Sequence, residues 1–127
     1  MHAARVLVVD DDALLLRIVS QMLWHEGYEV LASGSAHEAL QIVRSIGPVD
    51  LILTDMVMPG MSGTELVHEI AALSPQTPSV LMTAVLIDPS GIPEGVPVLR
   101  KPFSKRDLIC AVEAALARSA KGSYTEI

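Results

Sequence analysis

Two continuous apolar runs in this chain each lead directly into aspartates. The run at residues 6–9 is followed by three aspartates at 10–12. The run at 51–54 is followed by Asp55. An apolar run of this length is typical of a strand buried on both faces of a parallel sheet, so we expect these carboxylates at one carboxyl-terminal edge, where open α/β sheets bind ligands. Grouped carboxylates need a compensating proton or cation, and their oxygens suit a divalent metal ion.

The remainder of the chain alternates between strand and helix patterns. Strands are expected over 6–9, 28–32, 51–54, 79–82 and 96–99. Apolar residues at helical spacing predict helices over the segments 15–23, 36–43, 66–71 and 108–116. Such alternation predicts a parallel sheet with right-handed crossovers and helices on both faces.

Capping patterns mark where three of these helices begin. Ser35 and Glu38 form a capping-box pattern before the second helix. Ser62 and Glu65 form the same pattern before the third, and Ser104 is placed to cap the last helix. An isolated aspartate is also a common cap, which is the plainer interpretation of any one acid at 10–12.

One segment departs from the alternation. Residues 84–97 stand where a further helix would be expected, yet they contain three prolines and two glycines. Proline removes a backbone donor, and glycine raises the entropic cost of forming a helix. We therefore predict a loop here, or at most one helical turn.

Length and composition limit the class of protein. The 127 residues fit one domain, which we place at 1–118, followed by a polar C-terminal tail at 119–127 that we expect to be disordered. A formal net charge of −6 without a basic stripe argues against a direct nucleic-acid partner. No apolar stretch reaches the roughly 20 residues that cross a bilayer. The single cysteine, Cys110, excludes a disulfide framework, and we expect it in or beside the core of a cytoplasmic protein.

Polar residues therefore converge on one sheet edge in four motifs. The strings are Val-Leu-Val-Val-Asp-Asp-Asp, Asp-Met-Val-Met-Pro-Gly-Met-Ser-Gly, Met-Thr-Ala and Leu-Arg-Lys-Pro-Phe. In this order they resemble the receiver (CheY-like) domain of bacterial two-component response regulators, over about residues 6–116. The resemblance implies an α/β, flavodoxin-like, doubly wound sheet of five parallel strands in the order 2-1-3-4-5, with the fourth helix shortened or replaced by a Pro/Gly-rich loop.

The same resemblance implies a phosphoacceptor and a metal site. Asp55 would attack a phosphoryl group to give an acyl phosphate. Asp11 and Asp55 would bind Mg²⁺ directly with the main-chain carbonyl of Val57, and Asp10 would hold a metal-bound water. We choose Asp10 and Asp11 because they follow the strand at once, which leaves Asp12 as the expected cap of the first helix.

Two further residues receive roles by resemblance. The Thr83 hydroxyl would bond a phosphoryl oxygen, and the Lys101 ammonium would balance phosphoryl charge opposite the metal. The Lys101-Pro102 peptide resembles the family's cis bond. Taken alone, Thr83 is also an ordinary strand residue and Lys101 an ordinary surface lysine.

The implied function is signalling rather than turnover of a substrate. The phosphoryl donor would be a phosphohistidine on a histidine kinase or a histidine phosphotransfer protein, and phosphorylation would change binding to an output partner. The chain would catalyse only its own phosphorylation and dephosphorylation. A homodimer is compatible with this role, and both a free-standing receiver in a phosphorelay and a fragment of a hybrid kinase stay open.

Two features depart from the family pattern, which are the valine at position 98 and the proline-rich segment 84–97 in place of much of the fourth helix. Val98 stands where receiver domains usually carry an aromatic residue whose rotation accompanies movement of the threonine, so that coupling does not carry over. Val57 and Val85 stand two positions after the phosphoacceptor and the threonine. Neither can hydrogen-bond an attacking water, so slow self-dephosphorylation is expected.

Other functions were weighed against this one. A haloacid-dehalogenase-like phosphohydrolase also uses an aspartate nucleophile and Mg²⁺, but it needs a second acid where this chain has Val57. A flavodoxin needs a phosphate cradle that these loops lack. A passive pseudo-receiver would be favoured by loss of the acids, which are all present. The histidine–glutamate pairs at 25–26, 37–38 and 68–69 are expected to be surface residues rather than phosphorylation sites.

Overall fold

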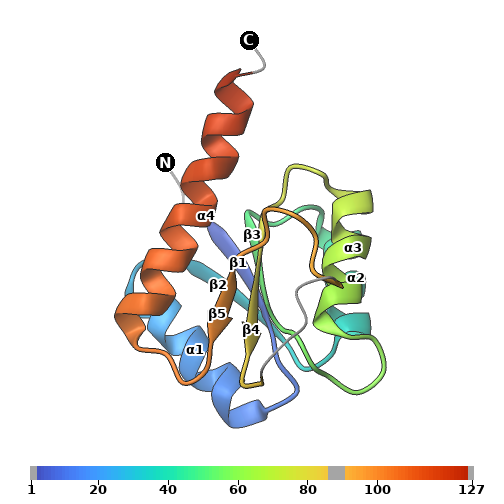
Figure 1. The fold of residues 1–127 in the computed structure, drawn as a ribbon, viewed down its shortest axis with the longest axis vertical. Coiled ribbons are helices and arrows are strands. Elements are labelled where there is room, and N and C mark those ends of the chain that lie inside the picture. The colour runs from blue at the N-terminus through green and yellow to red at the C-terminus, as the bar shows by residue number, and fades with distance from the viewer. Residues whose placement is uncertain (1–2, 86–90, 126–127) are drawn as a thin grey trace.

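The computed structural model of the protein describes residues 3–85 and 91–125. In chain order the elements are β1 (Arg5–Val9), α1 (Ala13–His25), β2 (Glu29–Ser33), α2 (Ala36–Ile46), β3 (Leu51–Asp55), α3 (Gly63–Leu73), β4 (Ser79–Thr83), β5 (Val98–Arg100) and α4 (Lys105–Thr125). Strands and helices alternate up to β4, as the sequence predicts (Figure 1).

The five strands form one sheet in the order β2-β1-β3-β4-β5, and every pair is parallel. The expected flavodoxin-like order is therefore confirmed. The register aligns the strand ends, because Val9 lies opposite Thr54 and Asp55 lies opposite Met82. Residues that follow β1 and β3 consequently emerge at the same edge of the sheet.

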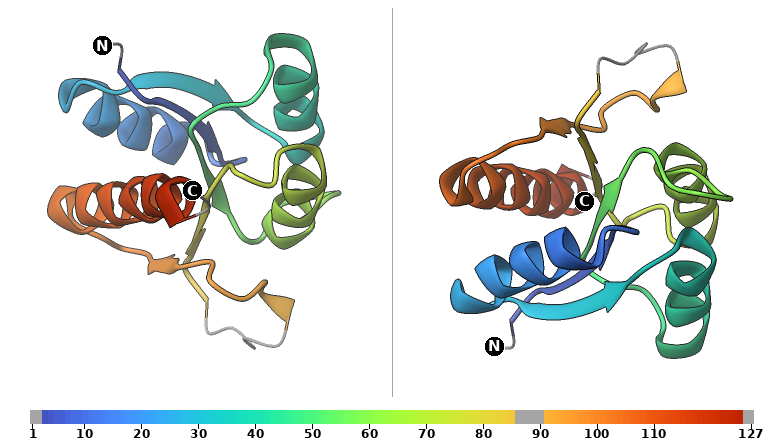
Figure 2. Two further views of the ribbon diagram at one scale, coloured as in Figure 1. Left: turned by 90° about the horizontal axis from the view of Figure 1, so that it is seen from above. Right: turned by 90° about the horizontal axis from the view of Figure 1, so that it is seen from below.

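Two helical layers cover the sheet. Figure 2 shows α1 and α4 on one face and α2 and α3 on the other. Alternate residues of β1 supply the two cores, since Val6 and Val8 pack in the cluster that contains α1 and α4 residues, whereas Leu7 and Val9 pack in the cluster with α2 and α3. All of them are fully buried, as expected for a strand with an apolar run and no polar face.

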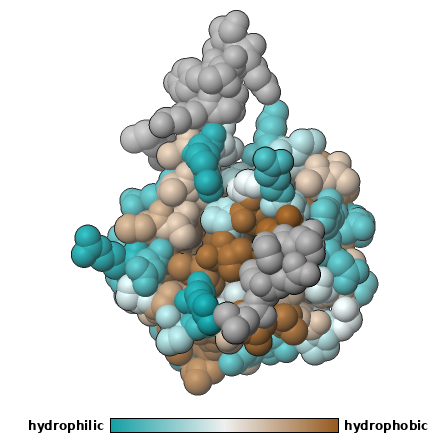
Figure 3. All heavy atoms as spheres, in the orientation of Figure 1, coloured by the Kyte–Doolittle hydropathy of each residue, from teal (hydrophilic) through white to brown (hydrophobic). Residues whose placement is uncertain are grey.

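The expected replacement of a helix between β4 and β5 is confirmed for the described residues of that segment, 84–85 and 91–97, which contain no α-helix. Residues 86–90 of the expected loop lie outside the description. Figure 3, in the orientation of Figure 1, shows hydrophobic atoms gathered near the middle of the face between α3 and α4. Val98, the first residue of β5, is exposed, and the described residues between β4 and β5 form no α-helix that could cover it.

The helix caps follow the sequence patterns. Asp12 is the N-cap of α1, and its carboxylate accepts from the backbone N–H groups of Leu14 and Leu15. Ser62 and Glu65 form the complete capping box of α3. Two further serines cap α2 and α4 by accepting from a backbone N–H three residues on, and these are Ser35 and Ser104.

In the structure α4 extends to Thr125, and Ser119 Oγ donates to the backbone carbonyl of Gln76 at 3.0 Å, so the segment expected as a polar tail begins within this helix. Two expectations need correction. Cys110 is exposed rather than in or beside the core, since Leu108 and Val112 define the buried face of α4 and Cys110 lies off it. The last strand spans Val98–Arg100 instead of 96–99.

We predict that Asp12→Ala destabilises the fold by about 1 kcal/mol, because two N–H groups at the start of α1 lose their acceptor. Asp11→Ala is the matched control, since no hydrogen bond or ion pair joins that exposed side chain to another described residue. Chemical unfolding should separate the two variants. Magnesium binding should change little in Asp12→Ala, and a collapse of Mg²⁺ affinity there would show that the acids have been assigned in the wrong register.

Candidate functional site

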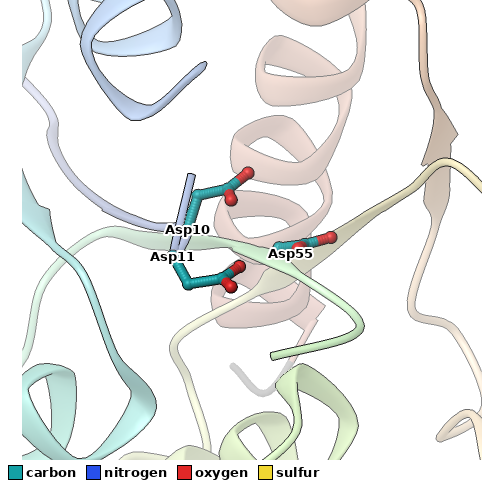
Figure 4. A group of neighbouring side chains, drawn as sticks. All are labelled: Asp10, Asp11 and Asp55. Carbon is teal, nitrogen blue, oxygen red and sulfur yellow. The ribbon is translucent and has the colours of Figure 1, made fainter. Parts of the chain in front are cut away.

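Three carboxylates meet at the carboxyl-terminal edge of the sheet. Asp10 and Asp11 follow β1 directly, and Asp55 is the last residue of the neighbouring strand β3. Each offers an oxygen such that the three atoms lie within 4.8 Å of one another (Figure 4). Asp10 and Asp55 are buried, whereas Asp11 is exposed. Clustered oxygens of this kind fit a hard divalent cation.

Lys101 supplies the positive charge of the cluster. Its Nζ lies 3.1 Å from Asp10 Oδ2 and 3.3 Å from Asp55 Oδ1. The lysine follows β5 directly, and the Lys101-Pro102 bond is cis, as the resemblance implies. One ammonium thus bridges carboxylates that come from two different strand ends.

Burial and charge act together on the titration of this cluster. Burial raises the pKa of Asp55 above its ordinary value, and the negative charge of Asp10 adds to this, while Lys101 lowers it. Burial disfavours the charged form of Lys101, yet the hydrogen bonds and charges of Asp10 and Asp55 together more than offset that effect and raise the lysine pKa. At neutral pH the lysine is therefore firmly cationic.

The aspartates differ in how they are held. Asp10 Oδ1 accepts from the backbone N–H of Asp12 at 2.9 Å, and Oδ2 accepts from Lys101, so both of its oxygens have protein partners. No hydrogen bond or ion pair ties the Asp11 carboxylate to another described residue. Asp11 is therefore free to turn toward an ion, whereas Asp10 is fixed in place.

Thr83 ends β4 beside this cluster and is buried. Its hydroxyl accepts from the backbone N–H of Val85 at 3.2 Å. Its carbonyl accepts from the backbone N–H of Lys101 at 2.8 Å, so main-chain pairing links the threonine and the lysine. The side chains of Val57 and Val85 are exposed, and the role of the Val57 carbonyl stays a prediction.

Gly63 is a site residue to which the sequence analysis gave no role. It is the first residue of α3, and a Cβ added there would overlap the carbonyl of Asp55 and approach Met56 Cα to 2.9 Å. Its N–H donates to the carbonyl of Met56 at 2.9 Å. Only a glycine allows α3 to start this close to the end of β3. The signal in the sequence was a glycine at the first position of a capped helix, where a side chain is normally tolerated.

Most of this chain matches one known protein family. The family model for the response regulator receiver domain matches residues 6–113. This chain belongs to the response regulator receiver domain family. The sheet order β2-β1-β3-β4-β5 is thus that of a receiver domain in two-component signalling.

Two curated relatives of this receiver domain are named as DNA-binding regulators. The chain is 36% identical over 122 residues to the DNA-binding response regulator MtrA of Mycolicibacterium paratuberculosis, covering 91% of this chain and 52% of the relative. It is 36% identical over 123 residues to the DNA-binding transcriptional regulator NtrC of Azospirillum brasilense, covering 91% and 25%. The chain therefore spans about half the length of the MtrA relative and about a quarter of the NtrC relative. The expectation that this chain has no direct nucleic-acid partner is therefore not supported by these relatives, because both are named as DNA-binding.

Solved structures agree with the receiver fold. A response regulator receiver protein from Sinorhizobium medicae has a TM-score of 0.86 at 26% identity, covering 92% of this chain and 97% of that one. A CheY-like receiver domain protein from Methanospirillum hungatei has a TM-score of 0.84 at 28% identity, covering 94% and 98%. Among the helices that the structure describes, none has the length and apolar character needed to span a membrane.

We predict that Gly63→Ala lowers both stability and Mg²⁺ affinity, because the added methyl group must push α3 away from the backbone of Asp55 and Met56. The stability loss should be about 1–3 kcal/mol, as for other overpacked sites. Gly34→Ala is the matched control, since a Cβ there meets no atom within 4 Å. Unfolding and Mg²⁺ titration of both receiver variants check this, and equal behaviour would refute the steric role of Gly63.

We predict that Asp55→Asn stabilises the metal-free receiver at neutral pH. Burial raises the pKa of Asp55 above its ordinary value, so the unfolded chain loses this proton more readily than the folded one. The contribution of protonated Asp55 to stability is thus fully present below the pKa that this group has in the unfolded chain. It is lost as the pH rises through the pKa that the group has in the folded protein. The melting temperature of Asp55→Asn should exceed that of wild type by a few degrees at pH 7 and by less near pH 3. A gain that is equal at both pH values would contradict the prediction.

Proposed function

We propose that Asp55 of this receiver domain accepts a phosphoryl group from a phosphohistidine on a histidine kinase or histidine phosphotransfer protein. The observation that carries the proposal is the group of three carboxylates within 4.8 Å of one another, two of them bridged by the Lys101 ammonium. A cluster with one fixed cation and an excess of negative charge is suited to binding a further cation and, through it, an anionic phosphoryl group.

The transfer requires little covalent chemistry from the protein. An Asp55 carboxylate oxygen forms the new P–O bond while the P–N bond to the donor imidazole breaks, and the imidazole leaves with its electron pair. Lys101 can follow the incoming charge, because it already lies 3.3 Å from Asp55 Oδ1. The Thr83 hydroxyl would exchange its present bond from Val85 for one to a phosphoryl oxygen.

Magnesium fits the donor set of this site. The carboxylates of Asp11 and Asp55 would hold the ion together with the Val57 carbonyl, and Asp10, whose oxygens are already engaged, would act through a bound water. When bound, the ion neutralises charge on the phosphoryl oxygens. The chain's own residues then position the nucleophile, and catalysis is confined to the domain's own phosphorylation and dephosphorylation.

Incubation with acetyl phosphate and Mg²⁺ tests the proposal. We expect one phosphoryl group per chain, located on Asp55, removed by hydroxylamine and abolished by EDTA or by Asp55→Asn. Lys101→Ala should reduce the rate of labelling by about 10²-fold or more, because a preorganised charge is lost. Lys105→Ala is the control, since that lysine pairs with Glu26 away from the carboxylates.

The alternative functions give different results in the same assay. Continuous release of phosphate from acetyl phosphate, without a stable label, would support a phosphohydrolase. Absence of both label and turnover would support a passive pseudo-receiver that only binds a partner. Either outcome would overturn the proposed phosphoacceptor role.

We predict that the phosphorylated protein hydrolyses slowly, because the exposed side chains of Val57 and Val85 offer no hydrogen bond to an attacking water. Val57→Asn should shorten the lifetime of the acyl phosphate several-fold. Val98→Thr is the control, because that position lies on β5 away from the end of β3. Decay of the label after removal of the donor measures the rate. A wild-type rate as fast as that of Val57→Asn would contradict this account.

A further inference from the structure

The outer edge of β2 is an unusual part of the surface. Within the part of the chain that the structure describes, no strand pairs with this side of β2 (Figure 2). The backbone N–H of Glu29 donates to the backbone carbonyl of Ala4, and the backbone carbonyl of Ser33 accepts from the backbone N–H of Asp10. These groups of β2 therefore face β1. Because backbone direction alternates along a strand, the N–H and C=O groups of Val30 and Ala32 point outward. An exposed edge of this kind is a template for another strand.

Apolar grooves lie on both faces of this edge. On the α1 side a groove of about 430 Å³ is lined by Leu16, Trp24, Val30 and Ala32 among others. On the α2 side a groove of about 340 Å³ includes Leu31, Ile42 and Ile46. The side chains of Trp24 and Ile46 are 64% and 48% exposed. A strand added beside β2 would therefore have to present apolar side chains to both faces.

The β2 strand itself meets this requirement. Val30 packs with the cluster on the α1 face, and Leu31 packs with the cluster on the α2 face. The other edge of the sheet, β5, has only three residues and ends on the exposed Arg100. Among the described edge strands, β2 is therefore the one whose apolar side chains suit the grooves beside β2 of another copy. This favours a second copy of the chain over an unrelated peptide as the added strand.

We infer that two copies of this chain associate through antiparallel pairing of their β2 strands, which makes one continuous sheet of ten strands. With a twofold axis at Leu31, Val30 of each copy lies opposite Ala32 of the other, and four backbone hydrogen bonds form. The same residues contact each other in both directions, as an isologous interface requires.

The α1 helices are complementary in this arrangement. The residues of α1 that line its groove run from Ala13 near one end to Trp24 near the other. Two antiparallel copies of α1 bring the large Trp24 of one copy toward the small Ala13 of the other. The interface also brings the Arg17 and Ser20 side chains of the two copies near each other, and the Ser20 hydroxyl is buried without a partner in the described structure.

Sedimentation velocity of the full chain at increasing concentration tests this inference. We expect a monomer–dimer equilibrium for wild type, and an increase in the dimer Kd of about tenfold or more for Trp24→Glu and for Ile46→Lys. Leu73→Lys is the matched control, because Leu73 is 47% exposed near the end of α3, away from β2. Its Kd should equal that of wild type. A monomer at every concentration up to about 1 mM would overturn the inference.

Amide exchange tests the register independently of any substitution. Raising the protein concentration should protect the amides of Val30 and Ala32, which are the outward donors of β2. Protection confined to α3, α4 or β5 would place the interface elsewhere and overturn the inference. The dimer should also form in Asp55→Asn, because the β2 edge does not include the phosphoacceptor, so failure of the proposed function would leave this test unaffected.

Discussion

The bridge from the Lys101 ammonium to Asp10 and Asp55 holds the functional edge of this molecule together. Three carboxylates within 4.8 Å repel one another, and burial of two of them increases the cost. Lys101 offsets part of that repulsion while leaving an excess of negative charge. The parallel sheet makes the arrangement possible, because its register brings the ends of β1, β3 and β5 to one side. The parallel register brings these charged residues together, and their ion pairs in turn connect the ends of the three strands.

The sequence predicted the sheet well for physical reasons. The apolar runs before Asp10 and Asp55 have one plausible environment, a strand buried on both faces, and the capping serines fix where helices start. Cys110 was misplaced because it was judged by residue type alone, although the helical spacing of Leu108 and Val112 puts it off the buried face of α4. The helix predicted over 108–116 extends further at both ends, to Lys105–Thr125, because no residue before Gly122 breaks it.

The sequence predicted the charged residues of the site but not the role of Gly63. Carboxylates and a lysine at strand ends can be placed from the order of the strands alone. The importance of Gly63 is a matter of contact between α3 and the backbone of Asp55, and no pattern of residue types reports such a contact. The valines at 57, 85 and 98 show the reverse case, since the sequence identifies them at once and the structure adds that all three are exposed.

The lack of a helix between β4 and β5, among the residues described there, has a consequence for how firmly Lys101 is held. The strand that precedes this lysine has three residues, pairs with a neighbour on one side only, and leaves Val98 and Arg100 exposed. Segments with few buried contacts open at lower free energy than the core of a domain. Opening of β5 would withdraw the ammonium and leave the aspartates uncompensated, whereas a phosphoryl group bound among them would add negative charge that attracts the ammonium back. Local unfolding of the sheet edge and charge binding at the acids are therefore thermodynamically linked in this molecule.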